Sequence, residues 1–128
     1  MTIRRLYHLD IPQAAEWISA NHRLHWRVRA ARTKAWREAT AWHAVNAGLP
    51  RLDRATVVCE LMFTQRRRRD PANWAPTAKA CVDGLVDAGV FIDDDASRVT
   101  GPDMRVSSDQ VRVPGVRLYL RPDGGDSR

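Results

Sequence analysis

The chain has 128 residues, of which 44% are hydrophobic and 28% are charged. A chain of this size supports one hydrophobic core and leaves no room for a second domain. Its apolar runs are too short to cross a bilayer, and its N-terminus lacks the apolar stretch of a signal peptide. We therefore expect a soluble, cytoplasmic protein with no membrane partner.

The net charge of +6 is unevenly distributed along the chain. Residues 1–69 hold 14 Lys and Arg against 5 Asp and Glu, whereas residues 70–128 hold 7 against 10. A basic half predicts a polyanionic partner, and an acidic cluster next to it predicts a bound cation. The alternative is a basic face that is only solvated.

Hydrophobic periodicity and turn residues predict six elements in the order strand, helix, strand, helix, strand, strand. Their expected ranges are 3–11, 29–47, 54–64, 76–88, 99–107 and 115–121. A loop over 12–26 joins the first two elements. This order indicates a small α+β domain over residues 1–122, with a mixed sheet of about four strands packed against two main helices. The Gly- and Asp-rich residues 123–128 are expected to form a disordered tail.

Each helix is predicted to bury one apolar stripe. In the first helix the stripe comprises Trp36, Ala39, Trp42 and either Val45 or His43, with at least one of the two tryptophans in the core. In the second helix the stripe comprises Val82, Leu85 and Val86, and the opposite face carries Lys79, Asp83 and Asp87.

The two cysteines, Cys59 and Cys81, lie in apolar segments and outside any C-x-x-C pair. We expect both to be reduced thiols in the core. None of the four histidines belongs to an H-x-x-x-H or Cys/His pattern, so no structural zinc site is predicted.

Four consecutive arginines, Arg66, Arg67, Arg68 and Arg69, directly precede Asp70. Adjacent cations of this kind typically contact phosphates without reading the sequence of bases. In an extended segment only alternate residues face one side, so about half of the run is expected to contact a nucleic acid.

Asp93, Asp94 and Asp95 follow the second predicted helix. Magnesium prefers oxygen ligands, and it needs only one or two protein carboxylates when waters and phosphate oxygens complete its shell. If the helix packs antiparallel on the sheet, Asp70 and the three aspartates return to the same edge, where a metal would orient a water. The alternative is a solvated acidic turn.

Three further positions are candidates for contacts with a phosphodiester. Lys79 would stabilise charge at a scissile phosphate, unless it forms only an i,i+4 pair with Asp83. Asn21 and Arg23 follow Ser19 in a loop whose polar side chains suit phosphate binding or, alternatively, loop capping.

Trp74 is expected to pack against the sheet rather than stack on a base.

These motifs resemble the signature of RusA-type Holliday junction resolvases, a family that occurs in phages and prophages. The central match comprises Arg66–Asp70, Asn73, Lys79–Leu85 and Ala88–Asp94. The loop Ser19-x-Asn21-x-Arg23 is similar to an S-x-N-x-R stretch near the N-terminus of the family. The resemblance covers about residues 3–121.

The resemblance implies a homodimeric, magnesium-dependent endonuclease that resolves four-way junctions and related branched DNA by paired symmetric nicks, in DNA recombination and repair. Manganese would be an alternative metal, and the cell would be a bacterium or a phage-infected host. The implied catalytic residues are Asp70, Lys79 and Asp94, and the implied metal ligands are Asp70, Asp93 and Asp94. The implied DNA contacts are Asn21, Arg23, Arg66, Arg67, Arg68, Arg69 and Asn73.

The chain departs from the family pattern at Ala72, where a second aspartate is usual. Asp95, Asp83 or a water would have to replace that carboxylate. The alternative hypothesis is a catalytically impaired protein that binds junctions or duplex DNA without cutting them. A further alternative is a basic protein that inhibits a host factor through its acidic face.

Overall fold

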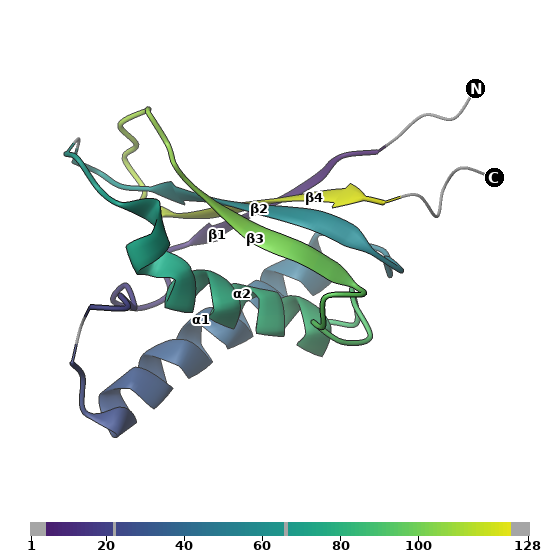
Figure 1. The fold of residues 1–128 in the computed structure, drawn as a ribbon, viewed down its shortest axis with the longest axis horizontal. Helices are drawn as coiled ribbons and strands as arrows, with labels where there is room; N and C mark the ends of the chain where they lie inside the picture. Colours follow the sequence, from purple (N-terminus) through teal and green to yellow (C-terminus); the bar gives the residue numbers. More distant parts are fainter. Residues whose placement is uncertain (1–4, 22, 66, 124–128) are drawn as a thin grey trace.

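The computed structural model describes residues 5–21, 23–65 and 67–123 (Figure 1). Its elements are β1 (Tyr7–Pro12), α1 (Trp26–Asn46), β2 (Ala55–Met62), the 3₁₀-helix η1 (Pro71–Trp74), α2 (Ala75–Asp87), β3 (Val99–Val106) and β4 (Gly115–Pro122). The predicted small α+β fold with a four-stranded mixed sheet and two main helices is confirmed. The start of the first predicted strand and residues 124–128 of the predicted tail lie outside the described residues.

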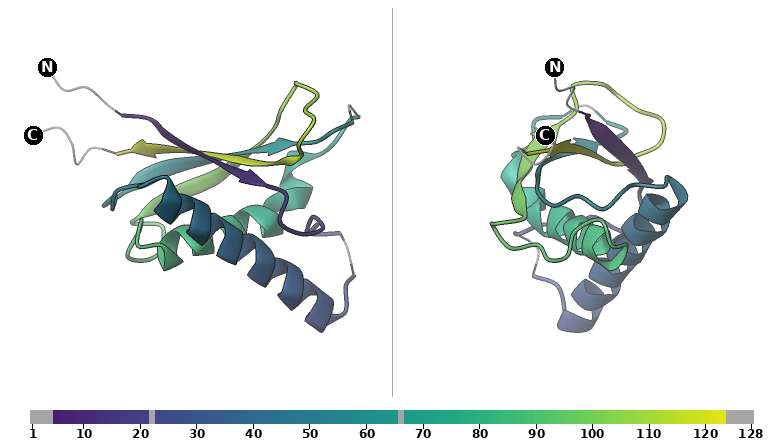
Figure 2. Two further views of the ribbon diagram at one scale, coloured as in Figure 1. Left: turned by 180° about the vertical axis from the view of Figure 1, so that it is seen from behind. Right: turned by 90° about the vertical axis from the view of Figure 1, so that its right-hand side faces the viewer.

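The strands are ordered β1-β4-β2-β3 across the sheet. Strand β4 is antiparallel to both β1 and β2, whereas β3 is parallel to β2. A parallel neighbour requires a long crossover connection, which α2 provides between β2 and β3. Both helices cover the same face of the sheet (Figure 2).

The core lies between that face and the two helices. Strand β2 alternates strictly, with Ala55, Val57, Cys59 and Leu61 buried and the residues between them half-buried. This period of two is the one expected for a strand with only one face against a core. The other face of the sheet is not covered by either helix.

The buried stripe of α1 differs from the predicted one. Trp36, Thr40 and Ala44 are buried, whereas Trp42 and Val45 are 62% and 66% exposed. The buried residues recur every four positions, the spacing of one ridge along a helix. Trp42 lies six positions after Trp36 and therefore about 120° away around the helix axis, which places it outside that ridge.

The second helix packs against α1 at a glycine. A Cβ atom at Gly84 would lie 2.4 Å from the carbonyl oxygen of Arg37 and 2.8 Å from Cβ of Thr40. The absence of a side chain therefore sets how closely the two backbones approach. In α2 the predicted Val82 and Leu85 are buried, and Val86 is half-buried.

Both cysteines are buried and free, as predicted. Among the described residues, no helix is both long and apolar enough to cross a membrane.

Candidate active site

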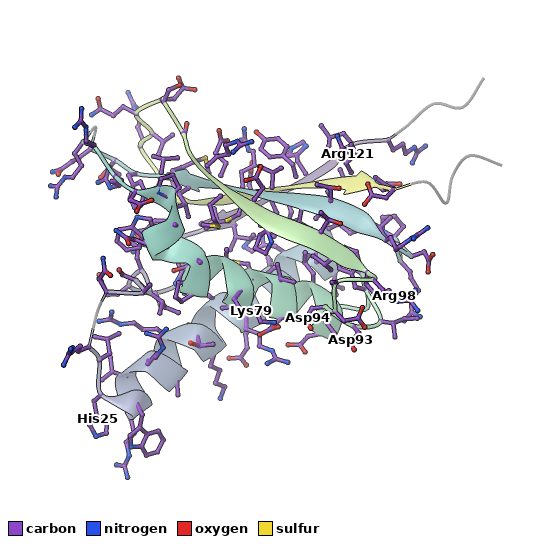
Figure 3. The ribbon with its side chains drawn as sticks, viewed as in Figure 1. His25, Lys79, Asp93, Asp94, Arg98 and Arg121 are labelled. Atoms are coloured by element: carbon purple, nitrogen blue, oxygen red, sulfur yellow. The ribbon has the colours of Figure 1, made fainter. Side chains whose placement is uncertain are left out.

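The outer face of α2 carries the cluster that the sequence suggested. Nζ of Lys79 lies 3.0 Å from Oδ1 of Asp83, one helical turn further along. The same ammonium also donates to Oδ2 of Asp94, which follows the helix (Figure 3). Lys79 is thus held between two carboxylates, and we call these three residues the Lys79 cluster.

A tight turn at the end of α2 brings Asp94 back to Lys79. Gly89 has φ of +84°, a conformation that favours glycine and ends many helices. The N–H of Val90 donates to the carbonyl oxygen of Leu85 at 3.0 Å, which closes this turn. The buried side chains of Val90 and Phe91 then anchor the chain, so the acidic residues that follow lie at the surface.

The three consecutive aspartates have different local roles. Oδ1 of Asp93 accepts the N–H of Asp94 at 2.7 Å. Oδ1 of Asp95 accepts the N–H of Ser97 at 2.8 Å. The same oxygen also accepts a hydrogen bond from the hydroxyl of Ser97. Asp95 is therefore engaged in its own turn, and among the three only Asp94 contacts Lys79.

The cluster is electrostatically matched. The hydrogen bond to Asp94 is the largest influence that raises the pKa of Lys79. The hydrogen bond from Lys79 in turn holds the pKa of Asp94 below its usual value. At neutral pH these shifts favour an ammonium on Lys79 and a carboxylate on Asp94, which suits Lys79 to electrostatic stabilisation and hydrogen-bond donation.

A second ion pair adjoins the cluster, and sequence reasoning did not identify it. The guanidinium of Arg37 in α1 binds both carboxylate oxygens of Asp87, at 2.5 and 2.8 Å. This pair is the largest influence that raises the pKa of Arg37, and the charges of Asp83 and Asp94 raise it further. Because 50 residues separate Arg37 from Asp87 in the chain, helical spacing gave no signal for the pair.

Asp70 lies elsewhere, at the start of η1. Its Oδ1 accepts the N–H of Ala72 at 3.1 Å, and Pro71 occupies the first position of the 3₁₀-helix. This arrangement is a side-chain cap of the kind that Asp commonly provides. Within the described ranges, Asp70 has no hydrogen bond or ion pair with Lys79, Asp93 or Asp94.

The arginine run is partly fixed by local contacts. Arg66 lies outside the described residues. Arg67 donates to Oε1 of Gln65 at 3.0 Å, and Arg69 donates to the backbone oxygen of Gln65 at 2.9 Å. The guanidinium of Arg69 also lies 3.8 Å from the ring centre of Phe63, and burial lowers the pKa of this arginine. Arg69 is thus the more firmly held of these arginines, whereas Arg67 and Arg68 are exposed.

The predicted N-terminal loop docks against η1. Nδ2 of Asn21 donates to Oδ1 of Asn73 at 3.1 Å, and the N–H of Ala20 donates to the backbone oxygen of Asn73 at 2.7 Å. The structure thus joins two predicted DNA contacts from distant parts of the chain. Ser19 is buried and its Oγ accepts the N–H of Asn21, which is the capping role given as the alternative. Arg23 is exposed.

Trp74 packs rather than projecting into solvent. Its ring centre lies 6.2 Å from that of Trp17 and 5.7 Å from that of Phe63. Trp17 in turn contacts the buried Trp36 at 5.1 Å. These contacts agree with the expected packing role of Trp74.

A magnesium ion fits this donor set only in part. Across residues 5–21, 23–65 and 67–123, no three His, Cys, Asp or Glu side chains gather as metal ligands. Asp93 and Asp94 are adjacent and reach the surface, and one or two carboxylates suffice when water and phosphate oxygens complete the shell. The residues therefore suit a weakly held magnesium at Asp94 better than a preformed site that includes Asp70.

No protein-family model matches the chain, and no curated protein matches it. The likeness to RusA-type resolvases therefore rests on the motifs in this sequence.

Proposed function

We propose that this chain is a magnesium-dependent endodeoxyribonuclease that cuts branched DNA, including four-way junctions. The observation that carries the proposal is the position of Lys79, which is held between Asp83 and Asp94 on an exposed helix face. An ammonium and carboxylates at one accessible point provide what phosphodiester hydrolysis needs, a charge donor for the phosphate and oxygen ligands for a metal.

The reaction is hydrolysis of one P–O bond. A water oxygen attacks phosphorus, the bond to the 3′ oxygen breaks, and the products are a 5′-phosphate and a 3′-hydroxyl. Asp94, with Asp93 beside it, would hold the metal, whose chemistry is to lower the pKa of a water and to offset charge at the leaving oxygen. Lys79 donates to a non-bridging phosphate oxygen once the substrate displaces it from Asp94.

DNA recognition is proposed to depend on phosphate contacts and junction shape rather than base sequence. Arg67 and Arg68 are exposed in the loop before η1, and Asn21 is hydrogen-bonded to Asn73 within η1. The proposed active form is a homodimer, because resolving a junction requires nicks in two opposing strands.

A second candidate function is DNA binding without cleavage. Two observations favour it, namely Ala72 at the position of the usual second aspartate and the absence of a three-carboxylate group among the described residues. In this alternative the arginine-rich loop binds DNA, and the Lys79 cluster is a surface ion pair.

Cleavage of a labelled synthetic four-way junction separates the two functions, with linear duplex as the control and Mg²⁺, Mn²⁺ or EDTA in the buffer. Paired symmetric nicks that require a metal support the enzyme. Tight junction binding with no product in either metal supports the alternative. Absence of junction binding contradicts both.

One variant tests Asp70 without disturbing the fold. Asp70→Asn keeps the oxygen that accepts the N–H of Ala72, so the cap of η1 remains while the charge is lost. Loss of cleavage with retained junction binding would assign Asp70 a role in the reaction. Unchanged cleavage would restrict the metal ligands to the residues near Asp94.

A further inference from the structure

A groove of about 610 Å³ runs along α1 and reaches α2. The aromatic and charged residues that line it are Trp26, Arg29, Lys34, Arg37 and Glu38 from α1 and Asp87 from α2. We call it the α1 groove. Its surface is largely apolar, and cations lie along it.

Trp26 forms an aromatic platform at one end of the α1 groove. Its side chain is 68% exposed, although tryptophan is usually buried. The ring of His25 stacks beside it, with 5.8 Å between ring centres and 27° between the planes. Nδ1 of His25 also accepts the N–H of Arg27 and so caps α1. The platform is thus fixed to the end of a helix rather than carried on a loop.

Cations predominate along the first three turns of α1. The helix has five basic residues before its only acidic one, Glu38. Arg29 and Lys34, which line the α1 groove, form no ion pair with any residue that the structure describes. Two unpaired cations beside an exposed aromatic ring are complementary to a ligand with both phosphates and flat bases.

The α1 groove leads from Trp26 toward the Lys79 cluster. Eleven residues separate Trp26 from Arg37, a distance of about 16 Å along a helix. Arg37 binds Asp87 and lies within electrostatic reach of Asp83 and Asp94. In Figure 3, His25 lies at the far end of α1 from Asp94, which agrees with this direction. Successive nucleotides along one DNA strand are about 3.4 Å apart. The α1 groove therefore has room for a few nucleotides.

We propose that the α1 groove binds an unpaired strand of branched DNA. Trp26 stacks on a base, and Arg29 and Lys34 contact phosphates, as on other single-strand surfaces. The inference rests on the proposed nuclease function for what happens to the strand at Lys79. It makes the substrate class specific, because forks or flaps with a single-stranded arm should bind more tightly than a fully paired junction.

Binding in EDTA tests the inference separately from catalysis. The probes are a fluorescein-labelled oligothymidylate, a duplex of the same length, and a fork with one unpaired arm, each followed by fluorescence anisotropy. The variant is Trp26→Ala, and the matched control is Trp42→Ala, an equally exposed tryptophan of α1 outside the α1 groove. Trp26→Phe tests whether an aromatic ring suffices.

We expect Trp26→Ala to weaken binding of oligothymidylate and fork by about 5- to 150-fold, the range for one stacked base. Trp42→Ala should stay within twofold of the wild type, and Trp26→Phe should recover most of the loss. Replacing Arg29 and Lys34 with Gln should reduce the slope of log affinity against log salt by about 1.4, or 0.7 for each phosphate contact.

Equal effects of Trp26→Ala and Trp42→Ala would overturn the inference, as would a preference for the fully paired junction over the fork. In those cases the proposed nuclease still stands if the junction is bound and cut. If Trp26→Ala changes the sedimentation mass of the protein but not its affinity for DNA, the α1 groove is a contact between copies of the chain. Absence of binding to every probe would overturn the proposed function too.

Discussion

Lys79 and Asp94 are 15 residues apart in the chain and form an ion pair on the outer face of α2. The Lys79 side chain is 59% exposed and that of Asp94 is 26% exposed. Ion pairs this accessible add little to the free energy of folding. Under the proposed nuclease function, this accessible position instead lets Lys79 reach a phosphate of the substrate.

Lys79→Met should therefore reduce cleavage of a four-way junction by about 100-fold or more, the usual effect of removing a donor that stabilises transition-state charge. The melting temperature should change little, because the ion pairs of Lys79 are solvated. Single-turnover cleavage and thermal denaturation measure the two effects. Arg105→Met is the matched control, since it removes a cation that pairs with Asp103 on the edge strand β3. Similar cleavage losses in both variants would contradict a specific role for Lys79.

Gly84→Ala should destabilise the protein although alanine is the better helix former. The added Cβ would lie 2.4 Å from the backbone oxygen of Arg37, which cannot move unless α1 shifts. Overpacking of this kind typically costs about 1–3 kcal/mol of unfolding free energy, more than the gain of about 1 kcal/mol in helix propensity. Urea denaturation followed by circular dichroism gives the difference. Gly48→Ala is the comparison, because no atom lies within 4 Å there and only the strain of a positive φ applies. A stabilised Gly84→Ala protein would show that the helices separate easily.

The strands were predictable because their burial pattern is local. In Ala55–Met62 every second residue is buried, and the alternation of apolar residues carries that information directly. The first helix begins at Trp26, three residues before the predicted start, because its cap is His25 rather than one of the usual capping residues. The 3₁₀-helix at Pro71 was missed, although Asp before Pro is a recognisable start signal.

The candidate site was predictable only where it depends on spacing along one helix. The pair of Lys79 with Asp83 follows from i,i+4 geometry. Its contact with Asp94 depends on the turn at Gly89, and the neighbouring pair of Arg37 with Asp87 depends on how α1 crosses α2. The exposure of Trp42 was unpredictable for the same reason, since a periodic pattern does not say which ridge of a helix faces the sheet.

The two thiols should be inert in the folded protein. Burial raises the pKa of the Cys81 thiol to about 12 and raises that of Cys59 well above its ordinary value. Only the thiolate reacts rapidly with disulfide reagents, and neither sulfur is accessible. We expect no thiol to react with a chromogenic disulfide at pH 8, and both to react once guanidinium unfolds the chain. Rapid reaction of either thiol without denaturant would mean that the sheet and α2 separate readily.

The pair of Asp10 with Arg117 should make stability depend on acid pH. Arg117 in β4 binds both oxygens of Asp10 in the edge strand β1, at 2.5 and 3.1 Å. This hydrogen bonding is the largest influence that lowers the pKa of Asp10 below 3.8.

Because the carboxyl loses its proton more readily in the folded state, the pair stabilises the fold above the unfolded pKa. That stabilisation disappears as the pH falls through the folded pKa. Asp10→Asn should therefore lower the unfolding free energy at pH 7 by at most about 1 kcal/mol, since both side chains are partly solvated. The difference from the wild type should shrink toward zero as the pH falls below 3.8 and through the lowered pKa of Asp10, and 1 M salt should reduce it at pH 7. Urea titrations of both proteins between pH 2 and pH 7 measure this difference in unfolding free energy. A constant difference across that range would mean that the charge of Asp10 contributes nothing to holding β1 against β4.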